Sequence, residues 1–262
     1  MFKQKFFSLG LAIGLAVTSV LATTPVPSAE LEEIEQRGKL IVAVKDNLRP
    51  LGFRGEDGNL QGLEIDIARH LAVELLGDPD ALVLQPVTNL DRLKVVLDGT
   101  VDLTIARVGF TEARARLVDF SDYYYLDGTG LVTKDASINE LEDVAARKIA
   151  VIKDSNTVAV LKDTLPNSEL VGVDSYQEAL TLLEKGVADA FAADKTVLTG
   201  WVQEYPQYRL LSARLSGAAL CVVIPKGLQH NSLHRKVNEA IARWEAEGWL
   251  AERAAAWGLP NE

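Results

Sequence analysis

Residues 101–125 read "VDLTIARVGFTEARARLVDFSDYYY", and this stretch joins a strand end to a polar turn. Its apolar first part predicts a buried strand that ends near Ala106. Gly109 then allows a close backbone approach in the turn, and Thr111 is a candidate N-cap for a short helix. Because a helix start presents free N–H groups and Arg114 adds a planar guanidinium, the stretch favours a carboxylate-binding site. A capped surface helix with a solvated arginine fits the spacing equally well.

The segments on either side of this stretch alternate between strand and helix patterns. Upstream, residues 39–44 indicate a strand, residues 63–77 an amphipathic helix and residues 81–87 a second strand. Downstream the alternation restarts at residue 130 and ends in two helices broken at Gly248. This pattern predicts an α/β fold of two similar units with no flexible tether. Ligands of such sheets lie beyond the carboxyl ends of the strands, so two facing units would place a site in the cleft between them.

The composition is that of an ordinary globular protein, with 48% hydrophobic and 24% charged residues. The formal net charge of -10 disfavours nucleic-acid binding, because proteins that bind nucleic acids are normally basic. Cys221 is the only cysteine, so no intramolecular disulfide can form. His230 and His234 have a spacing that can bind a metal, but no third ligand stands out and a solvated helix face is the favoured interpretation. We therefore expect no metal and no cofactor.

Residues 1–29 have the pattern of a secretory signal peptide. Lys3 and Lys5 precede an apolar stretch from Phe6 to about Ala22, and small residues and prolines follow. An uncleaved membrane anchor is the alternative. No cysteine follows the apolar stretch, so a lipoprotein is not expected. The pattern predicts export to the periplasm.

A second candidate site residue, Asp194, ends the apolar strand predicted over residues 188–194. An acid in that position can face a cleft, where it could hold an ammonium group. Arg114 and Asp194, facing each other across a gap, would together recognise a zwitterion. The alternative is that Asp194 only caps the helix that starts with "KTVLTGW".

Taken together, the chain resembles the periplasmic solute-binding proteins of polar amino-acid ABC transporters, the bacterial extracellular solute-binding protein family 3. The resemblance covers about Leu31 to Gly258 and implies a type II periplasmic binding fold, in which two α/β lobes are joined by two crossing hinge strands. It implies that residues 30–126 plus 218–262 form lobe 1 and that residues 127–217 form lobe 2. The matching stretches, in the order of the family, are "GNLQGLEIDIARHLAVELLG", "VTNLDRLKVVLDGTVDLTIA", "GFTEARARLVDFSDYYY", "KIAVIKDSNT", "DSYQEALTLLEKGVADAFAAD" and "IPKGLQHNSLHRKVNEAIARWEAEGWLAERAAAWG".

The resemblance also implies roles for individual residues. In this family the arginine of the Thr-x-x-Arg pattern holds the ligand α-carboxylate, which assigns Arg114 to that group with Thr111 at the same helix start. The acid that ends the strand in the second lobe holds the α-ammonium, which assigns Asp194. A turn in the second lobe that adds hydroxyl and N–H contacts is represented here by Ser155 and Asn156.

Departures from the family pattern bear on the ligand side chain. Arg107 and Gly109 occupy positions where the family often has small hydroxyl residues. Lys45 occupies a position that the resemblance associates with acidic ligands, and Arg92 matches an arginine that binders of acidic ligands use near the side chain. These cations, together with Arg114, would leave the cleft positive and favour glutamate or aspartate, because buried charge must be matched. The alternative is that Lys45 and Arg107 point to solvent or pair with acids such as Asp46 or Asp102.

The function expected from this resemblance is capture of a polar amino acid and its delivery to a permease in the inner membrane. We expect a monomer that is not an enzyme. An exported enzyme on the same fold, such as a cyclohexadienyl dehydratase, is one alternative and would need a general acid, for which Glu56 and Asp154 are undistinguished candidates. A stand-alone amino-acid sensor is the other alternative.

Overall fold

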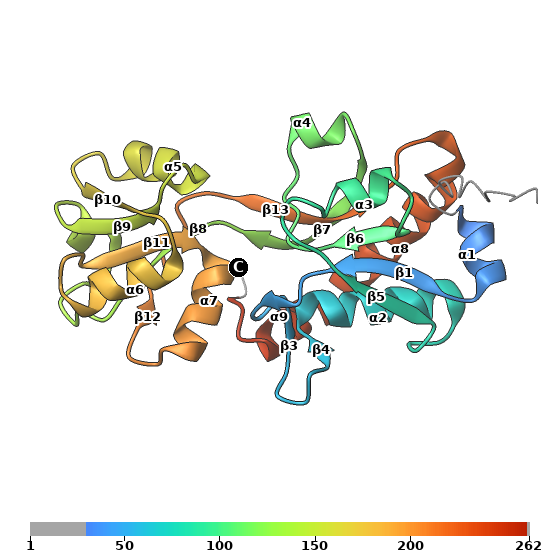
Figure 1. The fold of residues 1–262 in the computed structure, drawn as a ribbon, viewed down its shortest axis with the longest axis horizontal. Helices are drawn as coiled ribbons and strands as arrows, with labels where there is room; N and C mark the ends of the chain where they lie inside the picture. The colour runs from blue at the N-terminus through green and yellow to red at the C-terminus, as the bar shows by residue number, and fades with distance from the viewer. Residues whose placement is uncertain (1–29, 261–262) are drawn as a thin grey trace, which may run out of the picture.

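The computed structural model describes residues 30–260 of the chain. Within them two five-stranded sheets form the centres of two lobes, and a small three-stranded sheet lies beside the first lobe (Figure 1). The signal peptide expected over residues 1–29 lies outside the described residues. No helix within residues 30–260 is long and apolar enough to cross a membrane.

The sheet of lobe 1 has the strand order β5-β1-β6-β13-β7. Strands β5, β1 and β6 are parallel, whereas β13 runs antiparallel to β6 and β7. The parallel strands place their carboxyl ends at one edge of the sheet, where ligands of such sheets bind. The elements of this lobe are β1 (Leu40–Val44), α1 (Leu31–Arg37), α2 (Leu63–Leu76), β5 (Leu82–Pro86), α3 (Lys94–Leu97), β6 (Leu103–Ile105), α4 (Glu112–Ala115), β7 (Asp119–Asp127), β13 (Ala218–Ile224), η2 (Leu228–His230), α8 (Asn231–Ala246) and α9 (Trp249–Ala256).

The sheet of lobe 2 has the strand order β10-β9-β11-β8-β12. Strands β10, β9 and β11 are parallel, and β8 runs antiparallel to both β11 and β12. The elements of this lobe are β8 (Thr129–Thr133), η1 (Leu141–Val144), β9 (Lys148–Ile152), α5 (Asn156–Thr164), β10 (Glu169–Val173), α6 (Tyr176–Glu184), β11 (Ala190–Asp194), α7 (Lys195–Glu204) and β12 (Arg209–Leu210).

Two strands cross between the lobes. Strand β7 leads from lobe 1 directly into β8, and β13 brings the chain back, paired antiparallel with β7 (Figure 1). The predicted fold class, two α/β lobes joined by two crossing strands, is therefore confirmed. We propose that the lobe boundaries fall at residues 127 and 217, since β7 ends at Asp127 and β13 begins at Ala218.

The predicted helices with clear end signals are present, and the shorter ones are reduced. Helix α1 ends at Gly38 and α2 ends at Gly77, both in the left-handed conformation, and Gly248 separates α8 from α9 as expected. The sequence of residues 89–99 predicts a helix, but only α3 forms there, and residues 138–147, which also predict a helix, form only the 3-10 turn η1. Each of these two elements buries a single side chain, and isolated short helices are marginal without such packing.

Residues 45–62 are rich in Gly, Pro, Asp and Asn and predict a loop, but part of this stretch forms a small sheet. It contains β2 (Asn47–Leu48), β3 (Gly52–Arg54) and β4 (Leu60–Gln61), paired in antiparallel order. The strands were not predicted because they are only two to three residues long and the stretch is rich in glycine and proline.

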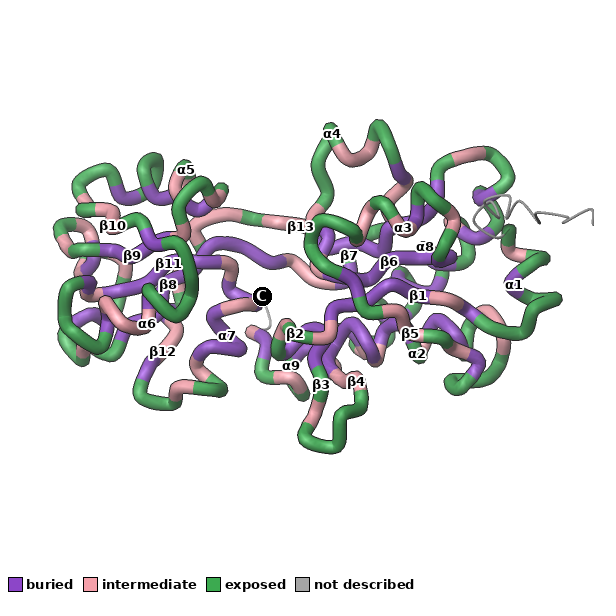
Figure 2. Tube along the Cα trace, in the orientation of Figure 1, coloured by how far each residue is buried: buried purple, intermediate pink, exposed green. Residues whose placement is uncertain are grey.

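Each lobe has its own core of buried residues, and Figure 2 shows buried positions along the strands of both sheets and within the helices. In lobe 1 the predicted stripe of α2 is buried at Leu63, Ile67 and Leu71, and Trp244 of α8 packs into the same core. Cys221 is buried on β13, within the apolar run "AALCVVI". The crossing strands thus join two separately packed bodies, the arrangement that permits hinge motion.

Asp127 fixes the junction between the crossing strand and α7. Its buried carboxylate accepts hydrogen bonds from the Thr196 hydroxyl at 2.6 Å, the Thr196 N–H at 3.1 Å and the Gly128 N–H at 2.8 Å. Asp127→Ala is expected to lower the free energy of unfolding by about 2–3 kcal/mol, because buried donors lose their acceptor. Chemical denaturation would measure this loss. Asp163→Ala, at an exposed position on α5, is the matched control and should stay within about 0.5 kcal/mol of the parent protein.

Candidate ligand-binding site between the lobes

The turn after β6 is held against β13. The Cys221 N–H donates to the Val108 carbonyl at 3.1 Å, and the Phe110 N–H donates to the Ala219 carbonyl at 2.9 Å. Between these two bonds, Gly109 forms a bridge with Leu220. The polar turn that follows a buried strand in the sequence is therefore anchored beside one of the two crossing strands.

The short helix α4 starts as predicted. The Thr111 hydroxyl accepts a hydrogen bond from the Arg114 N–H at 3.2 Å, which confirms the N-cap. The half-buried Arg114 side chain folds back, and its Nη1 donates to the Gly109 carbonyl at 2.7 Å. Within residues 30–260 no carboxylate forms an ion pair with Arg114, so most of its N–H donors are available to a ligand.

Arg107 and Asp194 pair across the two lobes. Arg107 follows β6 in lobe 1 and Asp194 ends β11 in lobe 2, and the guanidinium Nη1 donates to the Asp194 carboxylate. Asp194 occupies the N-cap position of α7 but makes no capping hydrogen bond with its side chain. Burial lowers the pKa of Arg107, but the Asp194 carboxylate outweighs this effect and the pKa is raised. The two side chains thus bring opposite charges together in the space between the lobes.

Lys45 and Arg92 lie in the same region, with their side chains directed to backbone carbonyls. The Lys45 ammonium donates to the Val87 carbonyl at 2.9 Å, and Arg92 donates to the Ala106 carbonyl at 3.1 Å. Burial lowers the pKa of Lys45. Burial, followed by repulsion from Arg114 and Arg107, lowers the pKa of Arg92 to about 10, so Arg92 stays charged at neutral pH. Three guanidiniums therefore converge after β6.

The alternative pairings considered from the sequence are not the ones that form. Asp102 is paired with Arg37, and Asp46 lies 3.5 Å from Arg54. Lys45 is only 6% exposed and does not point freely into solvent. Lys45 is therefore buried, and Arg107 is partly buried and paired with Asp194, near the carboxyl end of the lobe 1 sheet.

The turn before α5 follows β9 in lobe 2. Ser155 occupies the N-cap position of α5, and its hydroxyl donates to the Ile152 carbonyl at 2.7 Å. Asn156 is exposed beside it, and Asp154 adopts a left-handed backbone conformation with φ of 57°. The Ser155 oxygen and the Asn156 amide keep hydrogen-bonding capacity at the carboxyl end of β9.

The lobes also touch at a glycine. A side-chain carbon on Gly200 of α7 would lie 2.3 Å from the Arg49 carbonyl oxygen, so only glycine allows this approach. A cavity of about 510 Å³ lies next to this contact. Its lining comes from both lobes and includes Leu48, Arg49, Tyr176, Trp201 and Tyr205.

The structure also contains residues that were missed from the sequence. Glu64 is fully buried and its carboxylate accepts hydrogen bonds from the Tyr124 hydroxyl and the Arg107 N–H, each at 2.6 Å. The signal was present, because Glu64 stands at the start of the series 64, 67, 68 and 71, which has the spacing of a buried helical stripe. An acid at a core position of an amphipathic helix indicates a buried polar contact.

The remaining candidates from the sequence lie apart from this cluster. His230 is buried, and His234 has a ring nitrogen 2.9 Å from the Phe120 carbonyl. No group of three or more His, Cys, Asp or Glu side chains among the described residues is placed to hold a metal ion. Glu56 and Asp154, considered as general acids, are both exposed.

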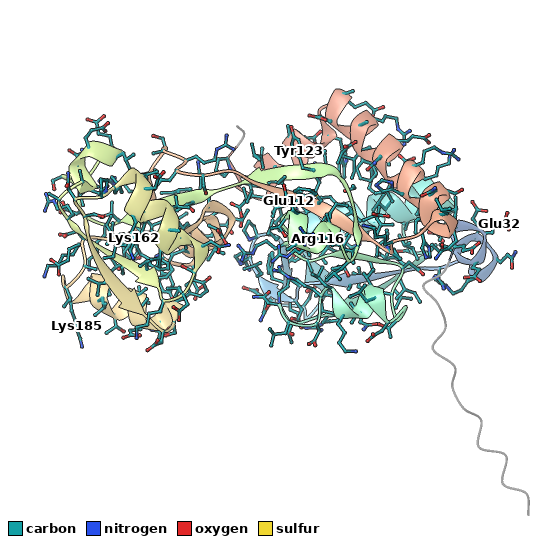
Figure 3. The ribbon with its side chains drawn as sticks, turned by 90° about the horizontal axis from the view of Figure 1, so that it is seen from above. Glu32, Glu112, Arg116, Tyr123, Lys162 and Lys185 are labelled. Carbon is teal, nitrogen blue, oxygen red and sulfur yellow. The ribbon has the colours of Figure 1, made fainter. Side chains whose placement is uncertain are left out.

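Helix α4, which carries Arg114, lies on the part of lobe 1 nearer to lobe 2. Figure 3 shows this placement through Glu112 and Arg116, which flank Arg114 in the sequence, while Lys162 and Lys185 mark the other lobe. Two α/β lobes joined by crossing strands, with Arg107 of lobe 1 paired to Asp194 of lobe 2, are the features of a binding protein of the type II periplasmic class.

Residues 40–260 match bacterial extracellular solute-binding proteins, family 3, and the chain belongs to this family. It is 36% identical over 189 residues to the glutamine-binding protein of Geobacillus stearothermophilus, which covers 71% of this chain and 72% of that protein. A solute receptor for L-cysteine of Neisseria gonorrhoeae shares the fold with a TM-score of 0.67 at 27% identity, over 87% of this chain and 93% of the receptor. An ancestral cationic amino acid solute-binding protein gives a TM-score of 0.74 at 25% identity, over 87% and 98% of the two chains.

Proposed function

We propose that this protein captures an acidic amino acid, glutamate or aspartate, between its two lobes and delivers it to an ABC transporter permease. The glutamine-binding protein and the L-cysteine receptor that the chain resembles are binding proteins for amino acids, which supports the amino-acid class. The signal-peptide pattern of residues 1–29 supports a periplasmic location.

The observation that carries the acidic preference is the convergence of Arg92, Arg107 and Arg114 after β6. Arg92 donates to the Ala106 and Arg107 carbonyls and Arg114 donates to the Gly109 carbonyl, so the three guanidiniums lie around one turn. The charges of Arg114 and Arg107 accordingly lower the pKa of Arg92. The acids that act on Arg92 and Arg107 are Asp194 and the buried Glu64 and Asp127. Lys45 adds a fourth cation, and Asp46 beside it is paired with Arg54, so the cations exceed the remaining acids by one. A ligand with two carboxylates and one ammonium matches this balance better than a neutral amino acid does.

In the proposed arrangement, Arg114 holds the α-carboxylate, Asp194 holds the α-ammonium and Arg107 meets the side-chain carboxylate. The guanidinium of Arg107 has several N–H donors, so it can keep Asp194 as a partner while it binds the ligand. Lys45 and Arg92 act mainly through their charge, because each is turned toward backbone carbonyls, of Val87 for Lys45 and of Ala106 and Arg107 for Arg92. Ser155 and Asn156 would add contacts from lobe 2.

Calorimetry on the exported form, against the twenty amino acids and simple dicarboxylates, tests the proposal. Tight binding of glutamate or aspartate without turnover would support it. Tight binding of glutamine or a basic amino acid instead would reject the acidic preference and keep the amino-acid class. Turnover of prephenate or arogenate would reject the binding-protein function in favour of an enzyme.

Arg107→Ala should reduce the discrimination between glutamate and glutamine. We expect the parent protein to prefer glutamate by at least about tenfold and the variant to lose that preference, because a charge-assisted pair contributes about 1.5–3 kcal/mol, which is more than about tenfold. Competition calorimetry with the two ligands would measure the ratio. Arg209→Ala is the control. It removes a partly buried guanidinium that donates to the Asp135 carbonyl within lobe 2, and it should leave the ratio unchanged. An unchanged ratio in Arg107→Ala would remove Arg107 from the side-chain site.

A further inference from the structure

Glu64 connects the ligand cleft to a crossing strand. One carboxylate oxygen, Oε1, accepts the Arg107 N–H at 2.6 Å from the turn after β6 and the Tyr124 hydroxyl at 2.6 Å from β7. Glu64 itself lies in the first turn of α2 and is fully buried. Three elements of lobe 1 therefore meet at a single oxygen atom.

The Arg107 backbone needs such support. Its φ of 48° lies in the left-handed region, which residues with a side chain rarely adopt and which has an energetic cost. The hydrogen bond from its N–H to Glu64 stabilises this conformation, and the left-handed backbone determines the direction in which the side chain leaves the turn. That direction brings the guanidinium to Asp194 of the other lobe.

Tyr124 gives Glu64 a fixed position. The Tyr124 side chain is 4% exposed and its hydroxyl donates to Oε1, so the carboxylate cannot move without breaking a contact with β7. Burial raises the pKa of Glu64, while the hydrogen bonds from Tyr124 and from Arg107 oppose this effect. The other charged groups that affect Glu64 include the Arg107 and Arg92 side chains.

We infer that Glu64 is a positioning residue for ligand binding: it holds the turn at Arg107 so that the Arg107 guanidinium crosses the cleft. The inference rests on the proposed ligand-binding role of Arg107. It assigns Glu64 no contact with the ligand, because its contacts are the Arg107 backbone and Tyr124.

Two substitutions can test separately the length of the Glu64 side chain and its negative charge. Oε1 makes both hydrogen bonds, whereas Oε2 is buried without a hydrogen-bond partner among the described residues. Glu64→Asp keeps the charge and shortens the side chain by one methylene, so the oxygen can no longer reach both donors. Glu64→Gln removes the charge and keeps an acceptor oxygen at the same reach.

The test is a double-mutant cycle between Glu64 and Arg107, read as affinity for whichever amino acid the parent protein binds most tightly. We expect Glu64→Asp to weaken binding by about tenfold in the parent and by less than about twofold in the Arg107→Ala background. Glu64→Gln should bind at least about fivefold more tightly than Glu64→Asp. Glu74→Asp is the matched control on α2. The Glu74 carboxylate accepts from Trp244 and pairs with Arg243, away from Arg107, so this substitution should leave affinity unchanged.

Each outcome bears on a different claim. An equal loss for Glu64→Asp with and without the Arg107 side chain would overturn the inference, because Glu64 would then act on binding by a general structural route. Weaker binding by Glu64→Gln than by Glu64→Asp would also overturn it, because charge would then matter more than reach. A parent protein that prefers glutamine over glutamate rejects the acidic preference alone, and the cycle with glutamine still tests Glu64. Both substitutions are conservative, and thermal melts would verify that each variant is folded.

Discussion

Replacing Arg114 with alanine is expected to weaken binding of the preferred amino acid by about a hundredfold to a thousandfold, or about 3–4 kcal/mol. The guanidinium is half-buried and is held beside the Gly109 carbonyl, with no carboxylate of the described protein paired to it. A ligand carboxylate would therefore supply the missing counter-charge, and its loss removes a charge-assisted, two-point contact.

Two further variants define what Arg114 contributes. Arg114→Lys keeps the charge but loses the planar fork, so its affinity should fall between those of the parent and Arg114→Ala. Arg116→Ala removes an exposed arginine only two residues away and should leave binding unchanged (Figure 3). Calorimetry at one pH and salt concentration would compare all three variants, and parent-like affinity in Arg114→Ala would reject the proposed carboxylate site.

The parts of the fold that were predictable from the sequence depend on local signals. Alternating apolar strands, the helical stripe of α2 and glycines at helix ends need no information about distant residues, and each gave an element near its expected position. The helices predicted over residues 89–99 and 138–147 were wrong in length because the prediction used local signals alone. Their patterns are helical, but only one side chain of each reduced element is buried, and tertiary packing decides how far such short helices extend.

In the candidate site, too, contacts between residues close in sequence were predictable and contacts between distant residues were not. The N-cap of α4 and the place of Arg114 after it lie within four residues, so the sequence was sufficient to predict them. The Arg107–Asp194 pair spans 87 residues and two lobes, and the Lys45–Val87 contact spans 42 residues. Sequence patterns suggested that these residues face the cleft, but the choice of partner depends on how the lobes pack.

Replacing Asp194 with alanine is expected to weaken binding of α-amino acids by about thirtyfold to a thousandfold, because a desolvated ammonium would lose its counter-charge. The effect should depend on the ligand. A dicarboxylate of the same length without an amine, 2-oxoglutarate, has no ammonium to lose a partner and should bind the variant at least as tightly as it binds the parent. The loss of Asp194 also releases the Arg107 guanidinium from its partner in the other lobe, which favours the anionic ligand further.

Comparing the two ligands on two proteins separates this role from a structural one. Asp194 makes no capping hydrogen bond to α7, so the fold of lobe 2 should tolerate the substitution. Asp174→Ala, which removes an acid paired with Lys153 on the surface of the same lobe, is the control and should change neither affinity. If Asp194→Ala weakened glutamate and 2-oxoglutarate equally, Asp194 would act by holding Arg107 in place instead of by binding the ammonium. The amine would then be recognised elsewhere, and the assignment of the α-ammonium site would have to move to other acceptors that line the cleft.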